Sequence, residues 1–206
     1  MKPTEIIGNC SLWLGDCRDI LPSLPKVDLV LTDPPYGIGA DRTRNSQKDG
    51  WVDYGCEGWD KSRPEKICFD LIMRQGKQVI VWGGNYFTDY LPPTMQWLVW
   101  DKGQRDFSLA DAEFAWSSQN KAARVFDYAR AKAMQDGKEH PTQKPIALME
   151  WCLDLVKNCE TVADPFMGSG TTGVACANMG KTFYGIEREP KYFDIACKRI
   201  EQAYAQ

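Results

Sequence analysis

The chain has 206 residues, a mass of 23.4 kDa and 43% hydrophobic residues, which fits one fairly large domain with a real core. A net charge of −3 and an isoelectric point near 5.3 exclude a global attraction to nucleic acid, so any such binding needs a local basic patch. Apolar runs are too short to span a membrane, and eight cysteines without a C-x-x-C pair, with one histidine, exclude a zinc site. We therefore expect a soluble, cytoplasmic protein with reduced thiols, no membrane association and no metal.

Strand and helix patterns alternate along the chain. Strands are predicted at residues 11–14, 27–31, 78–82, 95–100, 112–116, 161–164 and 182–187, and helices at residues 64–74, 85–90, 145–157, 170–179 and 190–203. Pro64, Pro145 and Pro190 open three of these helices, as proline prefers at the first helical turn. The alternation predicts a single α/β domain over residues 1–206 with a mostly parallel sheet. Residues 95–100 and 112–116 have no helix between them and predict an antiparallel hairpin at the edge of the sheet.

The first strand with an unusual ending is "VDLVLTDPPYGIG", residues 27–39. Its apolar run is typical of a strand buried on both faces, and the two prolines force the strand to stop at Asp33. Ligands of open α/β sheets bind at the carboxyl ends of the strands. Asp33 and Tyr36 are therefore candidate ligand-binding residues, although Asp-Pro alone also begins ordinary turns.

A glycine loop follows a second predicted strand near the end of the chain. Gly168, Gly170 and Gly173 match G-x-G-x-x-G, and Glu187 stands about 20 residues further on, where a ribose-binding carboxylate belongs. This pattern predicts a nucleoside cofactor. A nicotinamide-dependent oxidoreductase would place the loop early, whereas here only one strand-length segment follows it, so the sheet must be completed by earlier strands.

Six ordered motifs resemble one known family. They are "GDC" (15–17), "TDPPYG" (32–37), "VIVWGGNYF" (79–87), "WLVWDKG" (97–103), "HPTQKP" (140–145) and "DPFMGSGTT" (164–172). Together they resemble the beta group of DNA amino-methyltransferases, which modify the N6 of adenine or the N4 of cytosine, and the resemblance spans roughly residues 11 to 200. It implies a Rossmann-like methyltransferase sheet with a circularly permuted motif order, in which the catalytic motif precedes the cofactor loop.

The resemblance also implies roles for individual residues. The catalytic residues would be Asp33, Pro34 and Tyr36, and the cofactor would be S-adenosylmethionine. Its binding residues would be Asp16, Cys17, Asp33, Thr142, Lys144, Asp164, Phe166, Gly168, Ser169, Gly170, Thr171, Thr172 and Glu187. His140 is expected to shape the loop rather than to act as a base.

The chemistry of an exocyclic amine agrees with these residues. Its lone pair is delocalised into the ring, so acceptors at Asp33 and at the Pro34 carbonyl would favour a pyramidal, nucleophilic nitrogen. Tyr36 would stack on a base that has left the duplex. Direct transfer then needs no metal and no covalent enzyme intermediate.

Two polar segments are expected to face double-stranded DNA. We expect residues 38–62 to form a long mobile loop, which carries Arg42 and Arg44 and directly follows the catalytic motif. Residues 118–139 lie where the family carries its target-recognition segment and supply Lys121, Arg124 and Arg130. This segment is short, which predicts either a short recognition site or a homodimer in which a second subunit supplies part of the DNA surface.

Adenine N6 is the preferred target, because the family members with aspartate at the position of Asp33 mostly modify adenine and cytosine enzymes more often carry serine. The alternatives are an N4-cytosine enzyme, transfer to an RNA base or a protein glutamine amide, a nicotinamide-dependent oxidoreductase, and a catalytically silent DNA-binding protein. The intact Asp33 to Tyr36 sequence argues against the last of these.

Overall fold

The computed structural model describes residues 1–39, 60–105, 110–129, 132 and 143–205. Its strands are β1 (Glu5–Ile7), β2 (Cys10–Leu14), β3 (Val27–Thr32), β4 (Gly76–Trp82), β5 (Gln96–Asp101), β6 (Ala112–Ser117), β7 (Arg124–Asp127), β8 (Thr161–Asp164) and β9 (Thr182–Glu187). Its helices are α1 (Cys17–Ile20), α2 (Lys66–Gln75), α4 (Ile146–Asp154), α5 (Thr171–Asn178) and α6 (Pro190–Tyr204), with 3-10 turns η1 (Leu21–Ser23) and η2 (Gly84–Tyr86).

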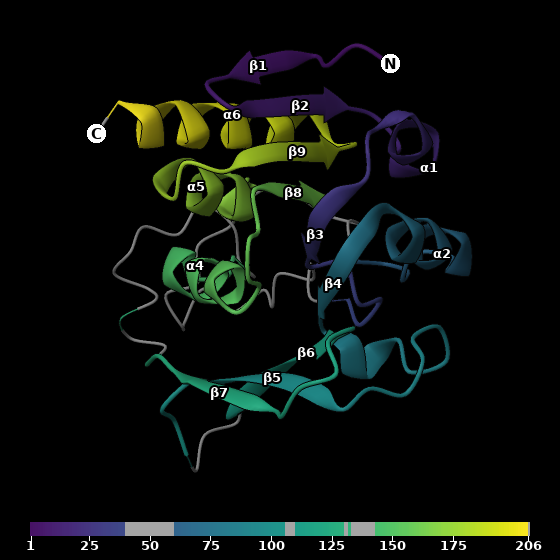
Figure 1. Ribbon diagram of the computed structural model, residues 1–206, viewed down its shortest axis with the longest axis vertical. Helices are drawn as coiled ribbons and strands as arrows, with labels where there is room; N and C mark the ends of the chain where they lie inside the picture. The colour runs from purple at the N-terminus through teal and green to yellow at the C-terminus, as the bar shows by residue number, and fades with distance from the viewer. Residues whose placement is uncertain (40–59, 106–109, 130–131, 133–142, 206) are drawn as a thin grey trace, which may run out of the picture.

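The strands form one sheet in the order β1-β2-β9-β8-β3-β4-β6-β5-β7, which runs from the top to the bottom of Figure 1. The five central strands β2, β9, β8, β3 and β4 are parallel, while β1 and β6 are antiparallel to their neighbours. The predicted hairpin is present as β5 and β6, and β7 adds a parallel strand on its outer side. The predicted α/β fold with a mostly parallel sheet is confirmed.

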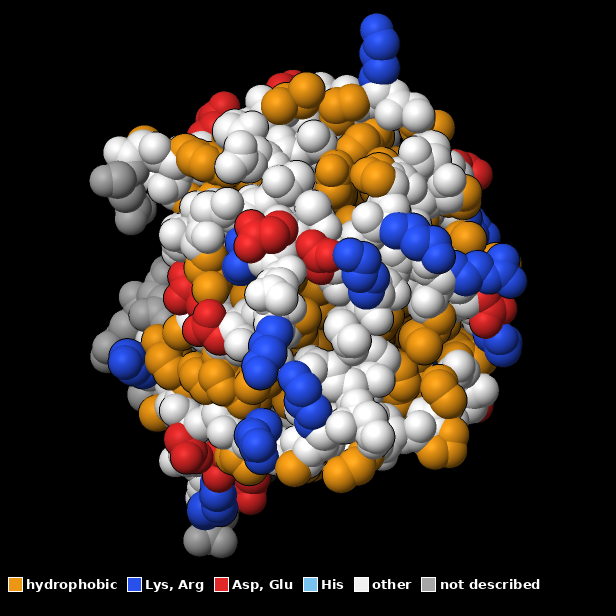
Figure 2. All heavy atoms as spheres, in the orientation of Figure 1, with side chains coloured by type: hydrophobic (Ala, Val, Ile, Leu, Met, Phe, Trp, Pro, Cys, Tyr) orange, Lys and Arg blue, Asp and Glu red, His pale blue; other side chains and the backbone are white. Residues whose placement is uncertain are grey.

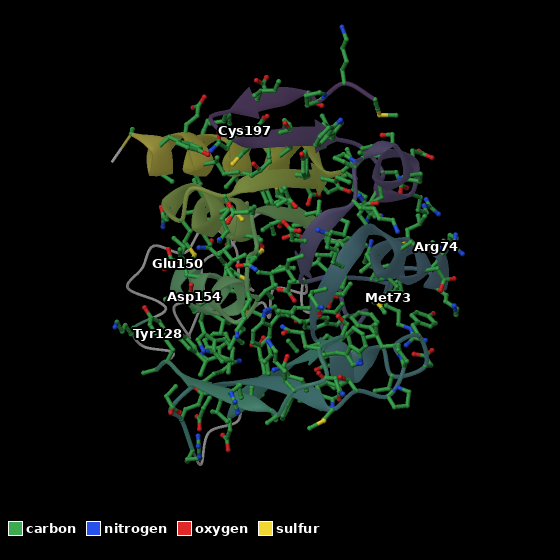
Figure 3. The ribbon with its side chains drawn as sticks, viewed as in Figure 1. Met73, Arg74, Tyr128, Glu150, Asp154 and Cys197 are labelled. Carbon is green, nitrogen blue, oxygen red and sulfur yellow. The ribbon has the colours of Figure 1, made fainter. Side chains whose placement is uncertain are left out.

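Alternate side chains of the central strands enter two different cores. Leu29 and Leu31 of β3 pack with α4, α5 and α6, whereas Val30 packs with α1 and α2 on the other face. Figure 3 shows the same division, with Glu150 and Asp154 on α4 to one side and Met73 and Arg74 on α2 to the other. Burial on both faces explains why the central strands are nearly continuous apolar runs.

One predicted helix is wrong. Residues 85–90 were expected to be helical, but only the short turn η2 forms there, followed by turns closed by hydrogen bonds from Tyr90 and Leu91 to the Phe87 carbonyl. Gly83 is left-handed at φ +68°, and two prolines at 92 and 93 end any helical continuation. The other predicted helices are present within a few residues, while β1, β7 and α1 are not anticipated by the sequence pattern.

The seven cysteines among the described residues are free thiols, six of them buried. Among the helices that the structure describes, none has the length and apolar character needed to cross a membrane.

Candidate active site

The sheet topology gathers the motif residues at one edge. Because β2, β9, β8, β3 and β4 are parallel neighbours, their carboxyl ends lie together. Asp16, Asp33, Asp164 and Glu187 each stand at or just after one of these ends. Strand β6 runs in the opposite direction, so its second residue, Glu113, lies at the same edge.

A cavity of about 790 Å³ opens at this edge of the sheet. It is lined by most of the predicted site residues, namely Asp16, Cys17, Asp33, Pro34, Tyr36, Lys144, Asp164, Phe166, Gly168, Ser169, Thr171, Thr172 and Glu187. The D-P-P-Y stretch and the glycine loop therefore line the same cavity. Gly170 lies outside the lining, where a Cβ atom would stand 2.8 Å from the Ala196 Cβ, so it serves the packing of α5 against α6.

The loop after β3 is held in place by backbone hydrogen bonds. Gly37, at φ +73°, and Ile38 donate their N–H groups to the buried Asp60 carboxylate at 2.7 and 3.2 Å. The Tyr36 ring stacks on Tyr86 with ring centres 4.7 Å apart and an interplanar angle of 16°. One face of Tyr36 is therefore already covered, and a base that stacks on this ring must use its other face or displace Tyr86.

The Asp33 carboxylate receives two hydrogen bonds. Lys144 Nζ donates to Oδ2 at 2.6 Å and the Tyr36 hydroxyl donates to Oδ1 at 2.5 Å. Burial raises the pKa of Asp33, against the opposing pull of the Lys144 ammonium. Burial lowers the pKa of Lys144, but the carboxylates of Asp33 and Glu113 outweigh it and bring this pKa well above its usual range. Lys144 thus stays charged and opposes the rise in the pKa of Asp33, whose carboxylate oxygens keep acceptor capacity for a further donor.

Asp164 joins the end of β3 to the glycine loop. Its oxygens accept hydrogen bonds from the Thr32 hydroxyl at 2.7 Å, from the Thr172 hydroxyl at 2.8 Å and from the Phe166 N–H at 3.1 Å. Burial raises the pKa of Asp164 to about 7, although these hydrogen bonds lower it. Asp164 therefore fixes the loop between β8 and α5 against the end of β3, and a direct contact with a cofactor stays a prediction.

The glycine loop leaves open space where a nucleoside could approach the backbone. Gly168 is left-handed at φ +54°, and a Cβ atom there would meet none of the described atoms within 4 Å. The Gly168 N–H donates to Glu187 Oε2 at 2.9 Å, and burial raises the pKa of this carboxyl. Arg199 of α6 supports the loop from behind by donating to the Ser169 carbonyl at 2.6 Å. An open glycine loop beside a half-buried carboxylate and the Phe166 ring fits a nucleoside cofactor.

The predicted DNA-binding residues are only partly described. Arg42, Arg44 and Arg130 lie outside the described residues, as do Thr142 and His140. Arg124 is exposed at the start of β7. Lys121 donates to the carbonyl of Leu155, which follows the carboxyl end of α4. Lys144 and Asp33 lie at the amino end of this helix, so Lys121 lies toward the opposite edge of the sheet from Asp33. In Figure 2 basic and acidic side chains are interspersed over the visible face.

Two residues that the sequence did not single out belong to the site. Glu113 and Lys102 line the cavity and form an ion pair at 2.5 Å. Each stands at an end of a hairpin strand. Lys102 is part of the quoted motif "WLVWDKG", whereas the sequence marks Glu113 only as a charged residue at the boundary of an apolar strand.

Comparisons with known proteins agree with this geometry. A family model described as DNA methylase, of the N6/N4 type, matches residues 81–198. The type II methyltransferase M.HinfI of Haemophilus influenzae is 28% identical over 246 residues, covering 91% of this chain and 67% of that protein. The type II methyltransferase M2.DpnII of Streptococcus pneumoniae is 30% identical over 224 residues, covering 85% and 83%.

Solved structures share the fold. A complex of M1.HpyAVI with SAM superposes with a TM-score of 0.64 at 25% identity, over 92% of this chain and 99% of that one. The cytosine-N4-specific PvuII DNA methyltransferase gives a TM-score of 0.65 at 15% identity, over 99% and 94%.

Proposed function

This chain belongs to the N6/N4 DNA methylase family, and we propose that it transfers a methyl group from S-adenosylmethionine to the exocyclic N6 of adenine in double-stranded DNA. One observation carries the proposal. The Asp33 carboxylate and the open glycine loop at Gly168 line the same cavity, at the carboxyl ends of the adjacent parallel strands β3 and β8. An amine acceptor and a nucleoside-binding loop thus face each other across one space.

The cofactor site fits S-adenosylmethionine, which supplies an electrophilic methyl group on its sulfonium when bound. The Gly168 backbone leaves room for the nucleoside, and Glu187 offers a carboxylate for ribose hydroxyls. Asp16, at the start of α1, is the proposed contact to the adenine ring, and Phe166 supplies an apolar wall. The complex of the related M1.HpyAVI with SAM supports this choice of cofactor.

The chain's own residues prepare the amine and remove its proton. The Asp33 carboxylate and the Pro34 backbone carbonyl each accept a hydrogen bond from one of the two N–H groups. These two hydrogen bonds hold the nitrogen pyramidal with its lone pair free. The methylated nitrogen carries a positive charge and releases one proton, which Asp33 accepts. Because burial raises the pKa of Asp33, this carboxylate is a better proton acceptor than an exposed aspartate.

Adenine is the proposed base, and N4 of cytosine is the alternative. Both amines offer the same two N–H bonds to the same acceptors. The fold does not separate them, since the cytosine-N4-specific PvuII enzyme shares it. Two arguments favour adenine. The carboxylate of Asp33 accepts a stronger hydrogen bond than the serine hydroxyl more frequent in cytosine enzymes, and a purine offers Tyr36 a larger stacking surface than a pyrimidine.

The test is to methylate unmodified DNA in vitro, digest it to nucleosides and identify the products by mass. We expect N6-methyladenine from the wild-type protein and none from Asp33→Ala, which should still bind S-adenosylhomocysteine in calorimetry. N4-methylcytosine as the only product would overturn the choice of base. Binding of NADH without binding of S-adenosylhomocysteine would overturn the methyltransferase assignment itself.

The relatives named as type II methyltransferases support a role in restriction-modification. Sequencing of DNA from cells that express the protein, with a method sensitive to base modification, would identify both the modified base and its sequence context. Random placement of the mark along the DNA would contradict a site-specific enzyme.

A further inference from the structure

The lysine that bonds to Asp33 is itself held by a second carboxylate. Lys144 Nζ lies 3.1 Å from Glu113 Oε2, and Glu113 Oε1 lies 2.5 Å from Lys102 Nζ. With the 2.6 Å contact between Lys144 and Asp33, the charges alternate along a chain of four side chains. In order, this row of charged side chains is Asp33, Lys144, Glu113 and Lys102.

The middle of this row of four charged side chains is shielded from water. The side chain of Lys144 is 4% exposed and that of Lys102 is 14% exposed, while Asp33 and Glu113 are 25% and 27% exposed. A buried ammonium that loses one of its partners is costly, so Lys144 needs both carboxylates. Burial raises the pKa of Glu113, but the ammoniums of Lys144 and Lys102 outweigh it and bring this pKa to about 2.

The four charged side chains come from four different segments, so the sheet sets their relative positions and no single flexible loop does. Asp33 follows β3, Lys102 follows β5, Glu113 belongs to β6 and Lys144 precedes α4. The hairpin register pairs Asp101 with Ala112, and the Lys102 N–H donates to the Asp111 carbonyl at 2.9 Å. Glu113 is therefore fixed relative to the central strands independently of the catalytic loop.

We propose that Glu113 is a positioning residue for methyl transfer, which holds the Lys144 ammonium against Asp33 and so fixes the carboxylate that receives the amine. The inference rests on the proposed function of Asp33. Lys144 occupies Oδ2 and Tyr36 occupies Oδ1, so the carboxylate cannot rotate freely, and each oxygen keeps a lone pair for the substrate. Lys102 secures the far oxygen of Glu113.

The charged and titratable groups that face Asp33 fix the sign of the effect on pH dependence. They are Tyr36 from the same loop, Lys144 from the segment before α4, Glu113 from β6 and Asp164 from β8. The negative charge of Glu113 raises the pKa of Asp33. The Lys144 ammonium lowers this pKa and is the stronger influence. If Glu113→Gln releases Lys144 from Asp33, the pKa of Asp33 should rise, and the acid limb of the rate should move to higher pH while the rate itself falls.

The test compares Glu113→Gln, which keeps the shape of the side chain, with Glu201→Gln, which makes the same charge change on the exposed face of α6. We expect Glu113→Gln to lower kcat by about 10- to 100-fold, because a displaced catalytic group costs rates of this order. Affinity for S-adenosylhomocysteine and the KM for DNA should change less than about twofold, since binding is not the affected step. The acid limb should shift to higher pH, whereas a shift to lower pH would mean that Lys144 stays on Asp33 and would contradict the positioning role. Glu201→Gln should match the wild type throughout.

A second measurement does not depend on activity. Nitrogen-15 NMR of the lysine ammonium groups, with the Lys144 signal assigned by its loss in Lys144→Arg, should show a slowly exchanging Lys144 signal in the wild type and its broadening in Glu113→Gln. A lower kcat with an unchanged acid limb and an unchanged Lys144 signal would overturn the proposal, as would a variant equal to the wild type. If the wild-type protein bound S-adenosylhomocysteine but methylated no DNA, the proposed function would fail, and the Lys144 signal would still decide whether Glu113 holds this lysine.

Discussion

A single added methyl group at Gly83 should displace Tyr36, the residue proposed to stack on the target base. Gly83 follows β4 at φ +68°, and a Cβ atom built there would lie 2.0 Å from Cε1 of Tyr36. Ordinary carbon contacts are about 3.5 Å, so the ring would have to move by roughly 1.5 Å. Tyr86 stacks on the ring at 4.7 Å and restricts that movement. Alanine at this position therefore forces a rearrangement of the Tyr36 and Asp33 pair.

Gly83→Ala should reduce stability both by backbone strain and by the steric clash with Tyr36, and substitution of a matched glycine separates these two effects. A left-handed conformation costs an alanine about 1 kcal/mol at any position. Gly180 has nearly the same φ, +65°, but a Cβ atom there would meet none of the described atoms within 4 Å. Gly180→Ala should thus lose only about 1 kcal/mol, or about 2–4 °C in Tm for a chain of this size. Gly83→Ala should lose more stability and about 100-fold in kcat, because displacement of a catalytic group by about 1 Å costs rates of that order.

The assay is tritium transfer from labelled S-adenosylmethionine to DNA under saturating conditions, with Tm measured by calorimetry on the same samples. Cofactor affinity should stay close to wild type in both variants, because Gly83 lines the cavity beside Tyr36 and not beside the glycine loop. If Gly83→Ala transferred methyl groups as fast as Gly180→Ala, the Tyr36 position would not control the reaction and the reasoning would be refuted.

Three further outcomes are expected. Burial raises the pKa of Asp164 from 3.8 to about 7, so the folded protein binds the Asp164 proton more tightly than the unfolded chain does. The free energy of unfolding from this proton is therefore lost as pH rises from about 4 to 7, and Asp164→Asn should flatten this pH dependence in urea unfolding. Arg199→Met removes a charged donor behind the cofactor loop and should weaken S-adenosylhomocysteine binding by about tenfold or more in calorimetry, with DNA affinity retained. Arg124→Ala combined with Arg130→Ala should weaken DNA binding in a low-salt titration without changing cofactor affinity; unchanged DNA affinity would remove residues 118–139 from the interface.

The parts of the fold that follow from local pattern are those that the sequence predicted. The central strands are buried on both faces, so their apolar runs identify them, and the glycine loop and the D-P-P-Y stretch follow such strands directly. Strand β7 could not be found this way, because it has four residues and pairs along only one edge, with Arg124 and Val125 exposed. Its position depends on β5, which is more than 20 residues earlier in the chain.

The charged chain beside Asp33 was missed for a different reason. Lys144 was expected to contact the cofactor, since its motif stands just before the cofactor loop in the sequence. Its ammonium instead lies on Asp33 and Glu113, and its role toward the cofactor stays a prediction. In the sequence Glu113 looks like an ordinary strand residue. It lies at the cavity only because β6 pairs antiparallel with β4, which places the start of β6 beside the carboxyl end of β4. Strand order decides this contact, and strand order is a long-range property.

The pairing of β3 with β8 explains why a permuted order of motifs still builds one site. Leu29 pairs with Val162 and Val30 with Ala163, so two strands more than 120 residues apart end side by side. The Thr32 hydroxyl then donates to Asp164 across this pair at 2.7 Å, which joins the residue before Asp33, the proposed catalytic acid, to the start of the glycine loop. The proposed reaction requires this lateral contact between two parallel strand ends. The chain can satisfy it with the catalytic strand early or late, because a parallel neighbour is reached by a crossover whose length is not fixed. Order along the sequence therefore carries information about the family, whereas the chemistry depends on which strands are neighbours.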